Sequence, residues 1–317
     1  MKEIGGYFEL EFNQKQSFHP NAIALNTARN CFEYILKAKN INKIFMPYYT
    51  CDVMLEPIQK LNIEFEYYHI DSNLEPEINE ENSKDDPVLY TNYFGLKQKV
   101  INRLSKKFKN LIIDNSQAFY QKRVKNTDTF YSARKFFGVP DGAYLYTDKF
   151  LPSNEIEQDF SFKRISHLVK RIELGANAAY PDFLKNDKTL YNQPIRRMSR
   201  FTEMALTSID YDTPKTIRER NFLYLHNELV DKNELSIDLD DLSGPMFYPF
   251  LYKKEGIRKL LLKKNIYVPT LWENVYTVTK KDDFEQYLTN FLIPLPIDQR
   301  YTISDMAYII SVLKHLL

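Results

Sequence analysis

A lysine at the end of an expected strand is the first candidate for chemistry. Lys135 lies in the segment DTFYSARKFFGVPDGAYLYT of residues 128–147, followed by Phe136 and Phe137 and then by a turn with two of the eight glycines. Aromatic surroundings favour the neutral form of a lysine amine, which is the form that attacks an aldehyde. A surface lysine in a loop is the plainer interpretation, and this segment alone does not decide between the two.

A carboxylate and an amide follow another expected strand, residues 111–114. Three apolar residues run into Asp114, and Gln117 comes three residues later. Ligands of open α/β sheets bind at the carboxyl ends of the strands, so Asp114 is a candidate site residue. An Asx turn, in which the same carboxylate accepts from the following backbone, is an equally good interpretation.

The start of an expected helix over residues 28–36 is a candidate phosphate site. Apolar residues recur there at helical spacing, and Asn26 or Thr27 stands at the N-cap position. The backbone amides of Ala28 and Arg29 then lack helical partners, and with the helix dipole they favour an anion without a glycine-rich loop. An ordinary helix cap is the simpler alternative.

The composition excludes several other chemistries. Glycine is 8 of 317 residues, against roughly 7% in an average protein, and neither GxGxxG nor GxxxxGK[ST] occurs. The two cysteines, Cys31 and Cys51, and the scattered histidines form no disulfide framework and no metal-ligand spacing, so we expect no metal site. The net charge of +1 gives no electrostatic reason to bind nucleic acid or an anionic membrane.

Targeting signals are not evident either. The acidic, alternating start MKEIGGYFELEF is unlike a signal peptide, and no apolar run approaches the ~18 residues that span a bilayer. We therefore expect a cytoplasmic protein.

The elements around the candidate residues predict an α/β fold with a mainly parallel sheet. Short apolar runs alternate with helical patterns, of which residues 28–36 and 97–108 are the clearest. The expected strands are residues 44–46, 65–68, 88–91, 111–114, 128–131 and 143–147.

The second half has a different character. Residues 155–235 are charged and helix-compatible, and the tail holds strand-like MFYPFLY and LIPLPI, a basic helix, and a closing helix for which Ser304 is the expected cap. We therefore expect a large α/β domain with connecting helices over residues 1–230 and a smaller C-terminal α+β domain over residues 231–317.

Taken together, the order of a phosphate-binding helix start, a strand-end Asp and a lysine 21 residues later resembles the large domain of fold-type I pyridoxal-phosphate (PLP) enzymes, the aspartate aminotransferase-like fold. More closely, the chain resembles the DegT/StrS family of nucleotide-sugar aminotransferases. The resembling stretches, between residues 4 and 301, are IGGYFELEF, ALNTARNCFEYIL, IFMPYYTCDVMLEPI, LYTNYFGL, LIIDNSQAF, SARKFFGVPDGAYL and PLPIDQRY.

The resemblance implies a role for each candidate. Lys135 would carry the coenzyme as an aldimine and move the proton between coenzyme and substrate, and Asp114 would pair with the pyridinium nitrogen so that the ring accepts electrons. Gln117 would hydrogen-bond the phenolic oxygen of the ring. The implied phosphate ligands are Ser132, Thr27, Ala28 and Arg29.

The aromatic ring that relatives place over the coenzyme is missing at its usual position. Cys51 falls there, and the alternatives from neighbouring segments are Tyr48, Tyr49 and Tyr93. Tyr7, Tyr93 and Trp272 are candidates for contact with a nucleotide or sugar.

The implied reaction transfers an amino group from glutamate to a keto-sugar nucleotide, for amino-sugar and polysaccharide biosynthesis. Relatives with histidine in place of the lysine are dehydratases, and Lys135 argues against that branch. The family builds its site across a homodimer, and candidates for the partner's contribution are Asn192, Arg197 and Arg200. Two alternatives stay open: a non-transaminating or nucleotide-sugar-binding member, and a metal-dependent glycosyltransferase-like α/β protein, for which DLDD at 238–241 is the nearest metal motif.

Overall fold

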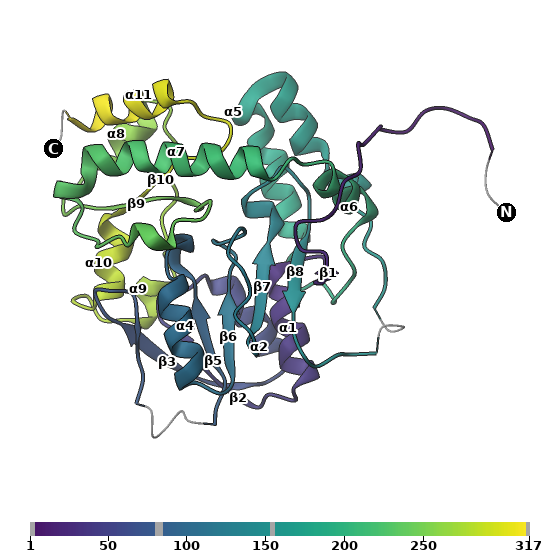
Figure 1. Ribbon diagram of the computed structural model, residues 1–317, viewed down its shortest axis with the longest axis horizontal. Helices are drawn as coiled ribbons and strands as arrows, with labels where there is room; N and C mark the ends of the chain where they lie inside the picture. The colour runs from purple at the N-terminus through teal and green to yellow at the C-terminus, as the bar shows by residue number, and fades with distance from the viewer. Residues whose placement is uncertain (1–3, 80–84, 153–155, 315–317) are drawn as a thin grey trace.

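An eight-stranded sheet forms the centre of the computed structural model, which describes residues 4–79, 85–152 and 156–314. Its strand order is β1-β8-β7-β6-β5-β2-β3-β4, and β3, β2, β5, β6 and β7 run parallel, which confirms the mainly parallel sheet (Figure 1). In chain order these strands are β1 (Ile23–Leu25), β2 (Lys43–Pro47), β3 (Glu64–Ile70), β4 (Pro76–Glu77), β5 (Val88–Thr91), β6 (Leu111–Asp114), β7 (Asp128–Ser132) and β8 (Ala143–Tyr146).

Both faces of this sheet are covered. In β6, the side chain of Ile112 packs with helices α1 and α2, whereas Leu111 and Ile113 pack in a different cluster with α4. Alternate residues of a strand point to opposite faces, and a sheet buried on both faces needs continuous apolar runs. The helices are α1 (Ala28–Ala38), α2 (Leu55–Lys60), α4 (Gln98–Lys107), α5 (Ser166–Thr189), α6 (Arg200–Thr207), α7 (Asp212–Leu229), α8 (Ile257–Lys263), α9 (Val275–Val278), α10 (Phe284–Phe291) and α11 (Ile303–Lys314).

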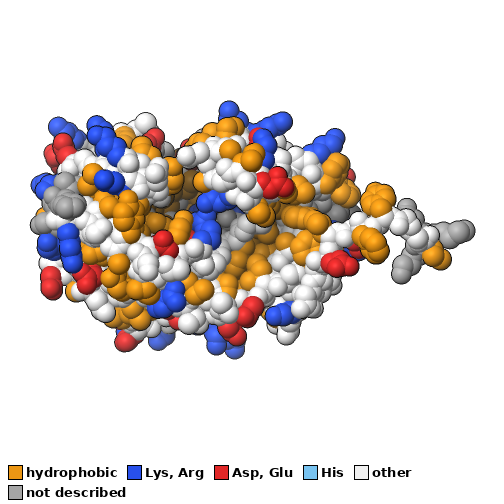
Figure 2. Space-filling model, turned by 90° about the horizontal axis from the view of Figure 1, so that it is seen from above, with side chains coloured by type: hydrophobic (Ala, Val, Ile, Leu, Met, Phe, Trp, Pro, Cys, Tyr) orange, Lys and Arg blue, Asp and Glu red, His pale blue; other side chains and the backbone are white. Residues whose placement is uncertain are grey.

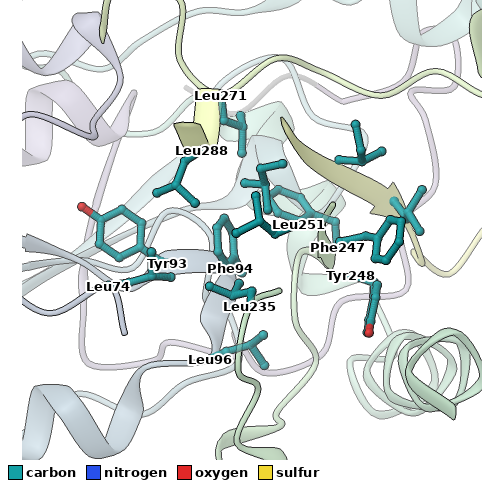
Figure 3. Packing of buried hydrophobic residues seen from close by; sticks show 14 of the residues in the cluster. Leu74, Tyr93, Phe94, Leu96, Leu235, Phe247, Tyr248, Leu251, Leu271 and Leu288 are labelled. Atoms are coloured by element: carbon teal, nitrogen blue, oxygen red, sulfur yellow. The ribbon is translucent and has the colours of Figure 1, made fainter. Parts of the chain in front are cut away.

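The C-terminal part packs directly against the sheet. Its strands β9 (Phe247–Leu251) and β10 (Leu292–Pro296) pair antiparallel. The ring of Phe94, in the turn after β5, lies 5.3 Å from that of Phe247, and the same apolar cluster continues to Leu288 of α10 (Figure 3). The cluster thus crosses the boundary expected at residue 230, and that boundary stays a prediction.

Some expected details are wrong. The cap of α11 is not Ser304, which lies inside the helix. Thr302 stands before the first helical residue, where its backbone N–H and its hydroxyl donate to Asp305 Oδ2 at 2.7 and 2.8 Å. The expected strands missed β1 and β4, because edge strands of two or three residues carry too few apolar positions to make a pattern.

A buried histidine joins the N-terminal segment to the sheet. His19 is 5% exposed, and its ring nitrogens contact the Tyr146 hydroxyl at 3.2 Å and the Phe119 carbonyl at 3.1 Å. Burial lowers the pKa of His19 to about 4. The folded protein therefore holds this ring neutral at pH 7.

We expect the stability to fall in acid because of His19. Its folded pKa of about 4 lies below the ~6.5 of an unfolded chain, so the unfolded state binds the proton first as the pH drops. The titration of this one group lowers the free energy of unfolding by about 2.5 kcal/mol between pH 7 and pH 4.5. Urea unfolding at both pH values measures the loss, and His19→Gln should shrink it; an unchanged pH dependence in the variant would contradict the assignment.

Candidate active site

A cavity of about 200 Å³ lies at the carboxyl ends of β6 and β7 and at the start of α1. Asp114 and Ser132 are the last residues of the two strands, and a parallel sheet brings such ends to one edge. The fold brings to this cavity every residue to which the resemblance assigns a contact with the coenzyme within one chain, and also Cys51. Those that line it are Thr27, Ala28, Arg29, Cys51, Asp114, Gln117, Ser132 and Lys135.

The start of α1 at the cavity is capped by a side chain and also has the features of an anion-binding site. The Thr27 hydroxyl accepts from the Asn30 N–H at 3.1 Å and donates to Asn30 Oδ1 at 2.6 Å, so Thr27, not Asn26, is the N-cap. The Cys31 N–H is the first to donate within the helix, to the Thr27 carbonyl at 3.0 Å, so the amides of Ala28 and Arg29 before it have no partner within the helix. Both residues line the cavity, which therefore lies at the positive end of the helix dipole.

Arg29 is fixed beside this helix start. Its Nη1 lies 2.5 Å from Glu56 Oε2, and the other oxygen of Glu56 accepts from the Asn192 N–H at 2.7 Å. Asn192 does not line the cavity itself. The Asn192 backbone is instead linked to Arg29 through the carboxylate of Glu56. A contribution of Asn192 to the site of a partner subunit stays a prediction.

Asp114 fits both of its interpretations. Its Oδ1 accepts from the Ser116 N–H at 2.7 Å, which is the Asx turn, and the same buried carboxylate lines the cavity. Gln117 is also buried, and its Oε1 accepts from the Phe94 N–H at 2.8 Å. That bond fixes the amide orientation, so the NH₂ of Gln117 is the group left to donate to a ligand.

Lys135 is exposed at the cavity, in the turn after β7. The two phenylalanines expected around its amine are buried instead with Phe119, in a separate aromatic cluster. Their contribution is to anchor the turn. The carbonyl of Phe136 accepts from Gln299 Nε2 at 2.9 Å and from Arg218 Nη2 at 3.4 Å, so the C-terminal part holds the backbone next to Lys135.

Cys51 faces the cavity, and the tyrosines proposed to compensate do not. Burial raises the pKa of the Cys51 thiol, with the nearby Lys135 charge acting in the opposite direction. Tyr49 and Tyr93 are fully buried and donate to backbone carbonyls, and Tyr48 stacks on Tyr67 with ring centroids 4.6 Å apart. Among the described residues, the aromatic ring on the cavity is that of Trp272.

Sequence reasoning missed an ion pair on the cavity wall. Arg134 Nη2 lies 3.1 Å from Asp187 Oδ1 on α5, and both residues line the cavity. Burial lowers the pKa of Arg134, against the opposing field of Asp187. The position of Arg134 directly before Lys135 is the one sequence feature that indicates a place at the cavity. No motif or spacing indicates Asp187 as its partner.

Outside the cavity, the fold brings three possible metal ligands together. Donor atoms of His69, Asp283 and Glu285 lie within 4.8 Å of one another. The buried Glu285 already accepts from the Ile70 N–H at 2.9 Å and contacts the His69 ring at 3.1 Å. The group therefore acts as a link between β3 and α10.

No protein-family model matches the sequence, and no curated protein sequence matches it. Solved structures match by fold. The sugar aminotransferase CalS13 from Micromonospora echinospora has 14% identity and a TM-score of 0.65, over 94% of this chain and 88% of that one. A DegT DnrJ EryC1 StrS aminotransferase from Brucella abortus has 12% identity and a TM-score of 0.60, over 93% and 85%. The chain has the fold of the DegT/StrS sugar aminotransferases.

This fold confirms the fold-type I PLP-enzyme prediction, but it does not decide the reaction. The GDP-4-keto-6-deoxy-D-mannose-3-dehydratase of E. coli, solved with bound hydrated PLP, matches equally, with 14% identity and a TM-score of 0.60 over 95% of this chain and 88% of that one. One fold hosts different chemistries, so the activity has to be argued from the cavity. In the described part of the chain, no helix is long and apolar enough to cross a membrane.

Replacing Arg218 should destabilise the protein strongly. Arg218→Met removes the donors that bind the carbonyls of Pro245 and Met246, both at 3.1 Å, in a site where the arginine is 2% exposed. Buried carbonyls left without a donor cost ~1–3 kcal/mol each, so we expect a loss of about 3 kcal/mol in urea unfolding. Arg220→Met, on the exposed side of α7, is the control and should stay within ~0.5 kcal/mol; equal losses in the two variants would contradict the role of Arg218.

Proposed function

We propose that the protein is a PLP-dependent aminotransferase that transfers an amino group from glutamate to a keto-sugar nucleotide. The observation that carries the proposal is the single cavity in which a free helix start, Asp114, Gln117 and Lys135 meet. The known structures of this fold include sugar aminotransferases. An amino-sugar product for a surface polysaccharide and a cytoplasmic location belong to the same proposal.

The residues of the cavity fit the chemical groups of PLP. The amides of Ala28 and Arg29 and the Ser132 hydroxyl suit its phosphate, since anions bind at helix N-termini. Asp114 offers a buried carboxylate for the ring nitrogen, and the NH₂ of Gln117 suits the phenolic oxygen. Lys135 supplies an exposed amine for the aldehyde.

Each residue then has a defined task. PLP supplies an aldehyde that exchanges amines and a ring that takes up electrons from the reacting carbon. The carboxylate of Asp114 holds the proton on the ring nitrogen, which a neutral side chain does less well. Lys135 Nζ would take the proton from the α-carbon of glutamate and then give it to the carbon on the coenzyme side, as a general acid–base group.

Lys135 should be the site of covalent attachment. Borohydride treatment of the protein loaded with PLP should add the reduced coenzyme to Lys135, as located by peptide mass spectrometry. Lys135→Ala should take up no label. The matched control Lys97→Ala, whose lysine follows a different strand and does not line the cavity, should be labelled like the wild type. Label that persists in Lys135→Ala would contradict the assignment.

Glutamate and a keto-sugar nucleotide together separate transamination from the other reactions of this fold. We expect one 2-oxoglutarate per active site to be released when the loaded protein meets glutamate in the absence of an acceptor. A keto-sugar nucleotide should then accept the amino group, and a screen of such acceptors with mass spectrometry of the product identifies the substrate. Coenzyme binding without 2-oxoglutarate release would favour a non-transaminating protein. A dehydratase of this fold has been solved with a trapped PLP-glutamate geminal diamine, so a sugar product that lacks the amino group would favour a dehydratase.

The acidic segment DLDD at 238–241 gives little support to the alternative of a metal-dependent, glycosyltransferase-like protein. Lys99 Nζ pairs with Asp238 at 2.7 Å and with Asp240 at 2.8 Å, and Asp241 accepts from the Lys99 N–H. None of these acids lines the cavity. Activity that is lost with a chelator and restored by a divalent metal would revive this alternative.

We also propose that the protein is a homodimer. Large apolar side chains are exposed along α5, including Ile172 at 86% and Leu174 at 64%, and along the N-terminal arm, including Tyr7 at 99% and Phe8 at 94%. The arm projects from the body (Figure 1), and hydrophobic side chains are visible on it (Figure 2). Contiguous exposed apolar surface is typical of an interface, and a second copy of this chain is the partner that the proposed function favours.

A charge placed on α5 should weaken this dimer. Light scattering should give about twice 37.7 kDa for the wild type, and Ile172→Glu should shift the protein toward monomer by burying an unpaired carboxylate in the interface. Leu262→Glu, at a 58% exposed position of α8, is the matched control. A wild type that is monomeric at micromolar concentration would contradict the proposal.

A further inference from the structure

The cavity has an aromatic wall that comes from the C-terminal part of the chain. Trp272 is the only tryptophan in the sequence, and it lies in the segment between α8 and α9. It lines the cavity together with Cys51, Val53 and Met54, none of which has a ring. A flat ligand in this cavity therefore meets an aromatic surface only at the indole, among the residues that the structure describes.

Trp272 is held in place by a buried tyrosine. The Tyr49 hydroxyl donates to the carbonyl of Leu271 at 2.8 Å, and the ring of Tyr49 meets the indole edge-on, with centroids 4.8 Å apart. Burial raises the pKa of Tyr49, so its hydroxyl stays a donor at neutral pH. The indole is thus oriented both by a hydrogen bond to its backbone and by a ring contact.

Two further hydrogen bonds fix the same junction. Asn274 Nδ2 donates to the carbonyl of Thr50 at 3.0 Å, and the Tyr93 hydroxyl donates to the carbonyl of Tyr49 at 2.9 Å. The turn after β2 and the segment that carries Trp272 are therefore joined on both sides of the indole. Such support limits the freedom of Trp272 before any ligand binds, which reduces the entropy lost on binding.

We propose that Trp272 covers the ring of the coenzyme, because Cys51 and not an aromatic residue faces the cavity at the end of the segment after β2. Asp114, Gln117 and Lys135 suit atoms on the edge of the pyridine ring and leave its faces uncovered. Offset stacking on an aromatic side chain stabilises such a face. This inference rests on the proposed function, and it makes the C-terminal part a contributor to coenzyme affinity.

Matched substitutions of Trp272 test the inference through the binding of PLP, without a measurement of enzyme activity. Trp272→Phe keeps a ring, whereas Trp272→Leu keeps an apolar side chain without one. Tyr276→Ala, at a 44% exposed position of the following helix α9 and outside the cavity, is the control. The measurements are the dissociation constant for PLP by equilibrium dialysis and the visible circular dichroism of the bound coenzyme, with the melting temperature of the coenzyme-free variants as a check on folding.

We expect Trp272→Leu to raise the dissociation constant about tenfold, which corresponds to ~1.4 kcal/mol, and to weaken the dichroism band. Trp272→Phe should stay within about threefold of the wild type, and Tyr276→Ala should equal it. If Trp272→Leu binds PLP as the wild type does, with an unchanged band, the inference is overturned while the proposed function stands. If the wild type binds no PLP, or borohydride labels a lysine other than Lys135, the proposed function itself fails.

Discussion

A fully buried guanidinium holds the C-terminal part of the chain to the turn that carries Lys135. Arg218 of α7 donates to the carbonyls of Pro245 and Met246 just before β9, to the carbonyl of Phe136 beside Lys135, and to Gln299 Oε1 in the tail. Its charge also lies over the ring of Phe136, with 4.6 Å to the centroid. Burial lowers the pKa of Arg218 to about 10, so the group stays protonated at neutral pH and keeps its five N–H donors.

This interaction explains how a turn can present an exposed lysine precisely. Two buried phenylalanines anchor the turn from one side, and Arg218 and Gln299 bind the carbonyl of Phe136 from another. The amine of Lys135 is left as the exposed part of an otherwise fixed segment. A positioned amine needs little reorganisation to react, which is the usual advantage of a site built on a rigid support.

The sequence predicted the parts of the site that follow from local pattern. β5 and β6 have the expected bounds, because continuous apolar runs are typical of strands buried on both faces. Thr27 caps its helix and Asp114 ends its strand as expected, and the order of the motifs placed Lys135 beside them. The strand bounds, the cap and the strand end depend on residues within a few positions of each other, whereas the place of Lys135 beside Thr27 and Asp114 follows from the family resemblance.

Contacts between distant segments could not be predicted in this way. The pairing of Arg134 with Asp187 and the support of Trp272 by Tyr49 join parts of the chain that no spacing relates. The phenylalanines after Lys135 were assigned to the wrong surroundings for the same reason, since only the packed structure shows which side of the turn is the core. Conformational details such as the cap of α11 depend on one hydroxyl, and neighbouring candidates are equivalent in sequence.

The most direct test of the account is a crystal structure of the protein grown with PLP. The account predicts continuous density between Lys135 Nζ and the coenzyme, with the phosphate at the start of α1, the ring nitrogen at Asp114 and the face of the ring against Trp272. Density for the coenzyme at another lysine, or a cavity that stays free of coenzyme at saturating concentration, would contradict it.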